Sequence, residues 1–471
     1  MKIIGRDKEH NQFQEFINSD SSEFVVVYGR RRVGKTFLVR EIFDNKFDFY
    51  HTGIANSDKE SQLAEFNFAL NQTATLPNTP VNSWFDAFHK LEFLLEHTKN
   101  KGKKIVFLDE LPWMDTSKSG FIQALELFWN KWASARKDIL LIVCGSATSW
   151  MFDKLINNRG GLHNRITQQI YLKPFTLKEC EDFFREKHIA LTRKQIAEVY
   201  MIFGGIPYYL NFFKKNLSLP QNVDAILFAE DAPLRNEFLS LYQSLFNHSE
   251  RYIEVVKAMG SKKKGLTRDE ILSVTKYTNG GGFTKLLRDL ELSGFIRKYR
   301  NIDKKEKNTI YQLVDFYTLF YFNFIDNIRH NDENYWSHLI DNAQHRAWSG
   351  FSFEQICLYH LPLIKRKLGI SGVLTNAASW VGAYNGSKVQ IDLLIDRNDG
   401  VINLCEMKFA KGIYAIDKST WRNLLNKMEV LRQSTKSRKA IHLTLITPLG
   451  ILQNEYSGEV NSEIVLDDLF L

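Results

Sequence analysis

The strongest constraint on the fold is an eight-residue loop, Gly-Arg-Arg-Arg-Val-Gly-Lys-Thr, that runs from Gly29 to Thr36. Residues 24–28 before it are apolar and rich in β-branched and aromatic types, which predicts a strand. Residues 37–43 after it carry apolar side chains at helical spacing. Strand, G-x-x-x-x-G-K-T and helix in this order are the context that a phosphate-binding loop requires. The sequence therefore predicts an α/β domain with a nucleotide site at this loop.

Each part of the loop has its own role at a phosphate group. Backbone N–H groups curl around the β-phosphate, and the helix N-terminus adds a favourable dipole. Lys35 is expected to reach the β- and γ-phosphates, and Thr36 offers a hydroxyl to Mg²⁺. The predicted cofactors are thus ATP and Mg²⁺. The candidate nucleotide-binding residues of the loop are Gly29, Arg30, Arg31, Arg32, Val33, Gly34, Lys35 and Thr36.

Two further apolar runs end in polar residues that suit the same site. Residues 104–108 lead into Asp109 and Glu110, and residues 139–144 are followed closely by Ser146. In a doubly wound sheet, ligands lie at the carboxyl ends of the strands. Asp109 is therefore expected to hold Mg²⁺ through water, Glu110 to orient and deprotonate the attacking water, and Ser146 to face the γ-phosphate.

Length and composition exclude several classes of protein. A chain of 471 residues predicts about three domains. The longest apolar runs, 139–144 and 316–322, are far shorter than the ~20 residues that span a bilayer, and the N-terminus has no signal core. We therefore expect a cytoplasmic protein with no membrane partner. The four cysteines form no C-x-x-C pair, which predicts buried thiols rather than a zinc site or disulfides.

The positive charge of the chain is concentrated in one window. Residues 251–310 hold fifteen Lys and Arg against seven Asp and Glu, an excess equal to the net charge of +8 of the whole chain. A local excess of this kind indicates a surface that faces a polyanion. The alternative is a solvated basic face that binds nothing.

The same window has the pattern of a winged helix-turn-helix. Helical spacing at 252–259, 267–274 and 283–292 is followed by strand-like runs at 295–300 and 309–314. Its third helix and its hairpin loop carry basic side chains that suit phosphate contacts, namely Lys285, Arg288, Lys304, Lys305 and Lys307. DNA is the predicted partner, with a packing or protein-interaction module as the alternative.

Two strand-like runs near the C-terminus, 388–396 and 401–408, flank a turn signal. With a three-residue loop at 398–400, Asp392 falls directly opposite Glu406 in the hairpin, and Lys408 shares their face by period two. A two-residue loop would slip the register and separate these side chains. Two carboxylates and a lysine on one face could hold Mg²⁺ and activate a water for phosphodiester cleavage. The alternative is an ordinary cross-strand pair on an exposed sheet.

Taken together, these motifs resemble those of the AAA+-like ATPases, and more narrowly the archaeal-type ATPases within the STAND class of signalling NTPases. Besides the loop and the two strand ends, the shared features are residues 4–6 (Ile-Gly-Arg) with Glu9, and residues 204–207 (Gly-Gly-Ile-Pro). The resemblance implies that Gly5 and Arg6 pack at the nucleotide base. It also implies an arginine that acts on the γ-phosphate, for which Arg165 is the candidate and Arg159 the alternative.

Asp392 with residues 406–408 (Glu-Met-Lys) resembles the PD-(D/E)xK motif of restriction-endonuclease-like domains, and the archaeal-type ATPases carry such a C-terminal domain. That superfamily often supplies an upstream acid, and Glu354, on a predicted helix, matches it. The resemblance therefore assigns Asp392 and Glu406 as metal ligands and Asp392, Glu406, Lys408 and Glu354 as catalytic residues.

The expected fold is α/β and has four parts. Its lid is predicted to begin with Thr176 as N-cap and Glu179 three residues later, with helical spacing to about Phe203. The expected parts are a P-loop ATPase core at 1–172, a helical lid at 173–235, a winged helix at 236–325 and a restriction-endonuclease-like domain at 326–471.

The leading interpretation is an ATP-hydrolysing switch coupled to a Mg²⁺-dependent nuclease-like domain that acts on DNA. The alternative is a STAND-type signalling or scaffold protein whose C-terminal domain binds nucleic acid or protein without cleaving. The sequence leaves open whether copies of the chain form a homo-oligomer.

Overall fold

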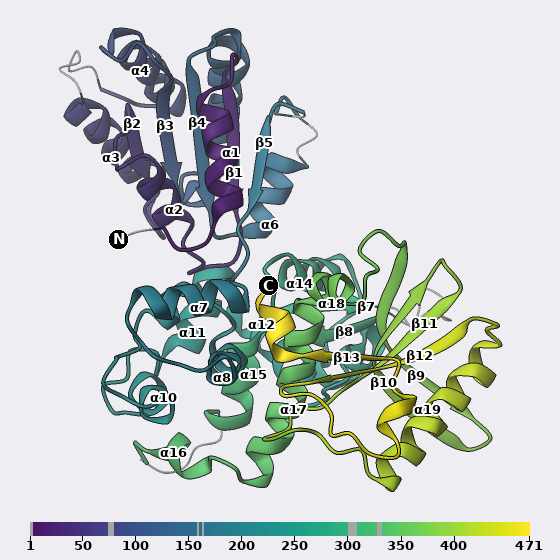
Figure 1. Ribbon diagram of the computed structural model, residues 1–471. Helices are drawn as coiled ribbons and strands as arrows, with labels where there is room; N and C mark the ends of the chain where they lie inside the picture. The colour runs from purple at the N-terminus through teal and green to yellow at the C-terminus, as the bar shows by residue number, and fades with distance from the viewer. Residues whose placement is uncertain (1–2, 74–79, 158–159, 163, 300–308, 327–331) are drawn as a thin grey trace. The chain divides into compact units, whose positions relative to one another are not determined.

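A computed structural model describes the chain except for residues 1–2, 74–79, 158–159, 163, 300–308 and 327–331. It divides into two compact units (Figure 1). The first comprises residues 1–174 and 244–247, and the second comprises residues 175–243 and 248–471. Within the described residues, no helix is long and apolar enough to cross a membrane.

The first unit contains a parallel sheet with the strand order β2-β3-β4-β1-β5. Its strands are β1 (Glu23–Tyr28), β2 (Phe49–Thr52), β3 (Lys104–Asp109), β4 (Ile139–Gly145) and β5 (Gln168–Tyr171). Its helices are α1 (Asp7–Ile17), α2 (Lys35–Ile42), α3 (Lys59–Thr73), α4 (Trp84–His97), α5 (Phe121–Leu127) and α6 (Thr148–Met151). The predicted strand, loop and helix at the start of the chain are confirmed.

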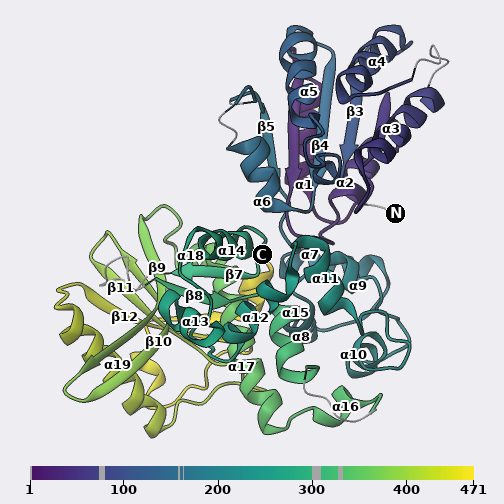
Figure 2. The same cartoon turned by 180° about the vertical axis from the view of Figure 1, so that it is seen from behind.

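Both faces of this sheet are covered, which explains why its strands read as continuous apolar runs. α1 lies over one face in Figure 1, and α5 lies over the opposite face in Figure 2. Phe24 and Val26 join the core that includes Trp84 of α4, whereas Val25 points the other way and is equally buried. The loops at the carboxyl ends of the strands are therefore the part of the sheet open to a ligand.

The second unit begins with helices. They are α7 (Leu177–Glu186), α8 (Arg193–Phe203), α9 (Pro207–Leu210), α10 (Leu219–Leu227) and α11 (Glu237–Leu245). The predicted capping box of Thr176 and Glu179 is present. The predicted helix to Phe203 is wrong as a single element, because Thr192 forms a second capping box with Gln195 and starts α8 anew.

The predicted winged-helix elements are all present. They are α12 (Ser249–Gly260), α13 (Arg268–Thr275), α14 (Gly281–Leu292), β7 (Ile296–Tyr299) and β8 (Ile310–Leu313), and a short strand β6 (Leu266–Thr267) completes a sheet of order β6-β8-β7. The predicted wing-tip residues Lys304, Lys305 and Lys307 lie outside the described residues. The aromatic helix α15 (Phe316–Phe324) follows, and six of its nine side chains are buried.

The C-terminal part contains a mixed sheet of order β13-β12-β11-β10-β9. Its strands are β9 (Thr375–Tyr384), β10 (Ser387–Arg397), β11 (Val401–Met407), β12 (Ala440–Thr447) and β13 (Ser462–Val465). Its helices are α16 (Tyr335–Leu339), α17 (Ala343–Tyr359), α18 (Leu361–Lys367) and α19 (Lys418–Thr435). β9, β10 and β11 pair antiparallel, and the remaining pairs are parallel.

The hairpin of β10 and β11 has the register that the three-residue loop predicts. Leu393 lies opposite Cys405 and Asp396 opposite Ile402, and Gly400 has the positive φ of 86° that the turn needs. The same register sets Asp392 opposite Glu406.

Candidate functional site

The loop before α2 is shaped by two glycines. Gly29 has a φ of 148°, and a Cβ there would lie 2.3 Å from the backbone oxygen of Leu172, so no other residue fits. Gly34 has a φ of 90° and forms the N-cap of α2, where its oxygen accepts from the amide of Leu38 at 2.9 Å. The loop therefore turns tightly into the helix N-terminus, as a phosphate cradle requires.

Lys35 is buried at the start of α2 and points back into the loop. Its Nζ donates to the backbone oxygens of Gly29 and Arg30 and to Ser146 Oγ, each at 3.1 Å. Burial lowers the pKa of Lys35, and the nearby Glu110 carboxylate opposes that shift. Because all three acceptors are neutral, the ammonium keeps the capacity to bind an anion.

The two candidate acids at the end of β3 are held by hydroxyl groups. Thr36 Oγ1 donates to Asp109 Oδ2 at 2.7 Å, and Ser146 Oγ donates to Glu110 Oε1 at 3.0 Å. Burial raises the pKa of Asp109. Glu110 has a φ of 46° and a ψ of 44°, a sparsely populated conformation for a residue with a side chain. The structure thus brings Lys35, Thr36, Asp109, Glu110 and Ser146 together.

The structure describes the environment of some of the candidate residues outside the loop and not of others. Gly5 and Arg6 both have positive φ, and Arg6 is buried, with Nη2 donating to the backbone oxygen of Lys173 at 2.8 Å. This ties the segment before α1 to the segment after β5. Arg165 is exposed in the turn before β5, and Arg159 lies outside the described residues. An action of either arginine on the γ-phosphate stays a prediction.

In the C-terminal part, Asp392 lies at an irregularity of the sheet. The pairing of β10 with β9 shifts between Ile391 and Leu394, so β10 bulges there. Ser379 Oγ donates to the backbone oxygen of Asp392 at 2.8 Å, and Asp392 Oδ2 accepts from the amide of Met407 at 3.1 Å. The bulge re-aims this side chain towards β11, where Glu406 lies.

The carboxylate of Glu406 forms ion pairs with two lysines. Lys408 Nζ lies 2.9 Å from its Oε1, and Lys427 Nζ lies 2.6 Å from its Oε2. Glu406 and Lys427 are both buried, whereas the Lys408 side chain is 40% exposed. Glu406 follows Ile402 and Leu404 at period two and shares their face, which packs against α19.

Lys427 is the residue that sequence reasoning missed. It lies on α19 within a buried stripe that also holds Leu424, Val430 and Leu431. A lysine inside the apolar stripe of an amphipathic helix is itself a signal, because an unpaired buried ammonium is costly. That signal predicts a buried acid as its partner, although it does not identify Glu406.

Glu354 on α17 belongs electrostatically to the same group of acids. Burial, followed by repulsion from Asp392 and Glu406, raises the pKa of Glu354 to about 8. Burial and repulsion from Glu406 raise the pKa of Asp392 to about 6. Three carboxyl groups thus share a region with too little positive charge to keep them all ionised.

The fit to a metal ion can be judged from these contacts. Across the described part of the chain, no group of three or more His, Cys, Asp and Glu side chains is arranged to hold one. The carboxyl groups of Asp392 and Glu406 are nevertheless the hard oxygen donors that Mg²⁺ prefers. The donor chemistry therefore fits Mg²⁺, with Asp392 and Glu406 as a pair.

The structure also shows the environment of two basic side chains on the winged helix. Lys285 and Arg288 are both exposed on α14, as predicted, and Lys285 pairs with Asp289 at 2.8 Å. The four cysteines, Cys144, Cys180, Cys357 and Cys405, are free and buried, also as predicted.

Comparison with known proteins gives one family match. Residues 3–213 match the family of ATPase domains found predominantly in Archaea. An uncharacterized protein of Methanocaldococcus jannaschii is 23% identical over 433 residues, which cover 91% of this chain and 92% of that protein. The match therefore extends from the first unit well into the second.

Two solved structures show modest overall similarity. The Walker-type ATPase of Pyrococcus abyssi is 20% identical, with a TM-score of 0.49 over 68% of this chain and 96% of that one. The ORC2 protein of Aeropyrum pernix is 12% identical, with a TM-score of 0.43 over 68% and 93%. The family match and the assembled loop, Lys35 and strand-end acids agree: the chain is an ATPase, and its residues 3–213 are similar to the ATPase domains found predominantly in Archaea.

Proposed function

We propose that the chain is an ATP-dependent switch whose C-terminal domain acts on DNA as a Mg²⁺-dependent nuclease. The observation that carries the nuclease part is the convergence of Asp392, Glu406 and Lys408 on one hairpin, with Glu354 close enough for Asp392 and Glu406 to help raise its pKa. A domain of this kind in the same chain as an ATPase supports control of one by the other.

In the ATPase domain, the chain's own residues divide the work. Lys35 leaves the loop oxygens to bind the β- and γ-phosphates, and Thr36 with Asp109 would hold Mg²⁺, which neutralises phosphate charge when bound. Glu110 orients and deprotonates the attacking water. Ser146, which bonds both Lys35 and Glu110, links the phosphate-binding cation to the base.

In the C-terminal domain, Asp392 and Glu406 would hold Mg²⁺, which supplies charge stabilisation and an acidic bound water. Lys408, already beside Glu406, orients the attacking water or neutralises the developing phosphate charge. Glu354, with its raised pKa, is suited to hold a proton near neutral pH. The basic residues of α14, Lys285 and Arg288, would contact DNA phosphates.

The test is cleavage of linear, circular and single-stranded DNA with Mg²⁺ or Mn²⁺, with and without ATP. Lys408→Ala should lower the rate at least about 100-fold, because one charge-stabilising group is removed. Lys388→Ala, an exposed lysine on the same hairpin as Asp392, is the matched control and should cleave normally. The cleavage rate of Lys35→Ala, compared with that of wild type in the presence of ATP, shows whether nucleotide binding controls cleavage.

If Lys408→Ala cleaves DNA at the wild-type rate, the nuclease assignment is contradicted. The second candidate is a signalling or scaffold protein whose C-terminal domain binds nucleic acid or protein without cutting. One observation favours it: both oxygens of Glu406 are occupied by lysines. DNA binding without cleavage under any condition, with ATP hydrolysis intact, would establish this second function instead.

A further inference from the structure

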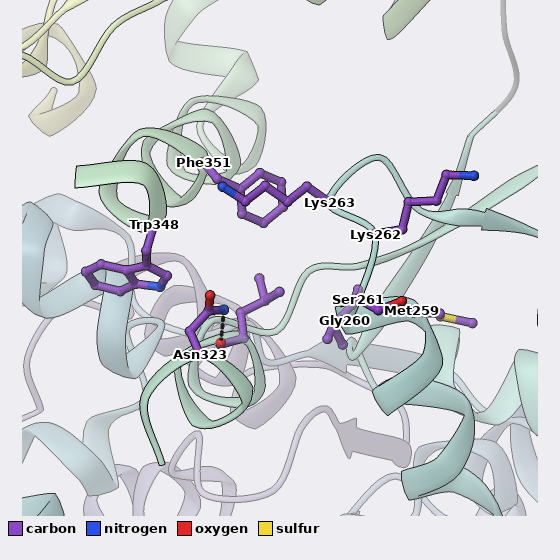
Figure 3. A pocket seen from close by; sticks show the side chains of 10 residues that line it. Met259, Gly260, Ser261, Lys262, Lys263, Asn323, Trp348 and Phe351 are labelled. Carbon is purple, nitrogen blue, oxygen red and sulfur yellow. Dashed lines mark hydrogen bonds between the residues drawn. The ribbon is translucent and has the colours of Figure 1, made fainter. Parts of the chain in front are cut away.

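A cavity of about 170 Å³ lies within the second unit, and none of its lining residues belongs to the candidate sites. The end of α12 and the loop after it, β8, α15 and α17 all contribute to its lining (Figure 3). The cavity therefore lies where the winged helix meets the helix that carries Glu354. A volume of this size holds a molecule as large as benzene.

Part of the cavity wall is apolar. Met259, Leu313 and Leu319 line the cavity, and each is less than 5% exposed. Phe351 is also buried and adds an aromatic wall. Ligand sites of small molecules have this composition, with a few polar groups that fix orientation.

One of those polar groups is the indole N–H of Trp348. The side chain is 2% exposed, and its Nε1 has no hydrogen-bond partner among the described residues. Figure 3 shows this nitrogen on the side of the ring that faces Asn323. Because buried donors are normally satisfied, an orphan N–H in a cavity wall points to an acceptor supplied by a ligand.

The second polar group is the ammonium of Lys263 at the exposed mouth of the cavity. Its Nζ donates to the backbone oxygen of Ala347 at 3.0 Å and lies 5.6 Å from the centre of the Phe351 ring. No ion pair to a carboxylate forms at Lys263 within the described residues, whereas the neighbouring Lys262 pairs with Glu270 at 2.7 Å. Lys263 thus forms no direct ion pair, and the acid within its electrostatic reach is Glu354, whose pKa is raised to about 8 mainly by burial.

We propose that this cavity binds a small organic carboxylate with a compact apolar body. The apolar body fills the space between Met259, Leu313 and Phe351, the carboxylate faces Lys263, and an acceptor atom reaches the Trp348 N–H. Such a ligand contacts α12, α15 and α17 at once and fastens the winged helix to α17. This site shares no lining residue with the ATPase site or the proposed nuclease site, although Lys263 acts electrostatically on Glu354 of the latter.

The test is isothermal titration of the full-length chain with sodium benzoate, and with benzamide as the uncharged ligand of matched shape. Wild type should bind benzoate at a single site with a Kd of about 0.1–1 mM. Lys263→Met should weaken benzoate binding about tenfold and benzamide binding by much less, because only the charged ligand loses an ion pair. Lys264→Met, the next lysine along the loop and not part of the lining, should change neither.

Trp348→Phe keeps the aromatic wall and should weaken both ligands, because the N–H donor is lost. Its thermal midpoint and its ATP hydrolysis, compared with wild type, confirm that the variant is folded. Absence of saturable benzoate binding to wild type up to 10 mM, on the order of ten times the weakest expected Kd, would overturn the proposal. Equal benzoate affinity in wild type, Lys263→Met and Trp348→Phe would overturn it as well.

Discussion

The two candidate sites use the same kinds of side chain but hold their charges differently. In the first unit, the buried Lys35 ammonium bonds to backbone oxygens and to Ser146, while the neighbouring acids bond to hydroxyl groups. In the C-terminal site, Glu406 is paired directly with Lys408 and Lys427. The first site therefore keeps its cation available for an anionic ligand, whereas the second has one acid already neutralised by the protein.

Under the proposed function, this difference sets what each site needs before it can bind its ligand. ATP binding at Lys35 replaces weak neutral contacts with charged ones, so the site is prepared for its ligand. A metal ion at Glu406 must compete with two ammonium groups. The acids without such partners, Asp392 and Glu354, are the ones with raised pKa values. Of the two, Asp392, whose pKa is about 6, is ionised near neutral pH and can offer its charge to a cation.

The largest effect is expected at the buried pair of the C-terminal site. Lys427→Met should lower the free energy of unfolding by about 3–5 kcal/mol, because it leaves Glu406 buried with half of its charge partners removed. Lys408→Met, at a half-exposed side chain, should cost about 1 kcal/mol or less. Thermal unfolding of both variants measures the contrast, and Glu406→Leu added to Lys427→Met should restore much of the loss.

Equal destabilisation by Lys427→Met and Lys408→Met would contradict this comparison. It would mean that Glu406 takes its stabilisation equally from either lysine, and that burial of Lys427 does not matter.

The next effect concerns the first site. Lys35→Ala should lower the rate of ATP hydrolysis about 100- to 1,000-fold, because the transferred phosphoryl group loses its main protein cation. Lys46→Ala, at a lysine whose side chain is 82% exposed, is the control and should hydrolyse ATP normally. A steady-state phosphate-release assay measures both. Hydrolysis within tenfold of wild type in Lys35→Ala would show that this lysine does not bear on the transition state.

The two sites also differ in how far the sequence could predict them. The residues of the nucleotide loop are contiguous, so their identity and flanking elements determine their geometry from Gly29 to Thr36. The hairpin of β10 and β11 was predictable only for a given loop length, because a three-residue loop and period two put Asp392 and Glu406 on one face whereas a two-residue loop would not.

What the sequence could not supply comes from contacts between distant segments. Lys427 meets Glu406 only because α19 packs on the face of β11 that Glu406 shares with Leu404, a tertiary contact across 21 residues. The bulge at Asp392 depends on pairing with β9, which no local pattern reveals. Thr192 and Gln195 form a capping-box pattern that predicts the break between α7 and α8. The apolar spacing continues on both sides of the break, and spacing alone therefore predicts one helix.

A third prediction compares a buried histidine in each unit. His360 accepts from the amide of Leu177 at 3.1 Å through Nε2, while Nδ1 contacts the backbone oxygen of Ile356, so the folded state requires a neutral ring. Burial lowers the pKa of His360 to about 4. The unfolded chain therefore binds more protons between about pH 4 and 6.5, and the contribution of His360 is complete above pH 6.5 and lost as the pH falls through that window.

The stability difference between wild type and His360→Gln should therefore shrink by about 3 kcal/mol from pH 7 to pH 4, as measured by chemical unfolding. His51 in the first unit is also buried, with a pKa lowered to about 4, so His51→Gln should behave alike. A difference that stays constant with pH would show that neither ring must be neutral in the folded state.

The smallest expected effect distinguishes the basic winged helix from the catalytic sites. Lys285 and Arg288 are exposed on α14, so each would neutralise about one DNA phosphate without reading its sequence. Arg288→Ala should reduce the slope of log affinity against log salt by about one, for all DNA sequences alike. Fluorescence anisotropy over a salt series measures this slope. Because Lys285 pairs with the buried Asp289, Lys285→Ala should reduce the slope by less than one. An unchanged slope in both variants would contradict phosphate contacts by α14.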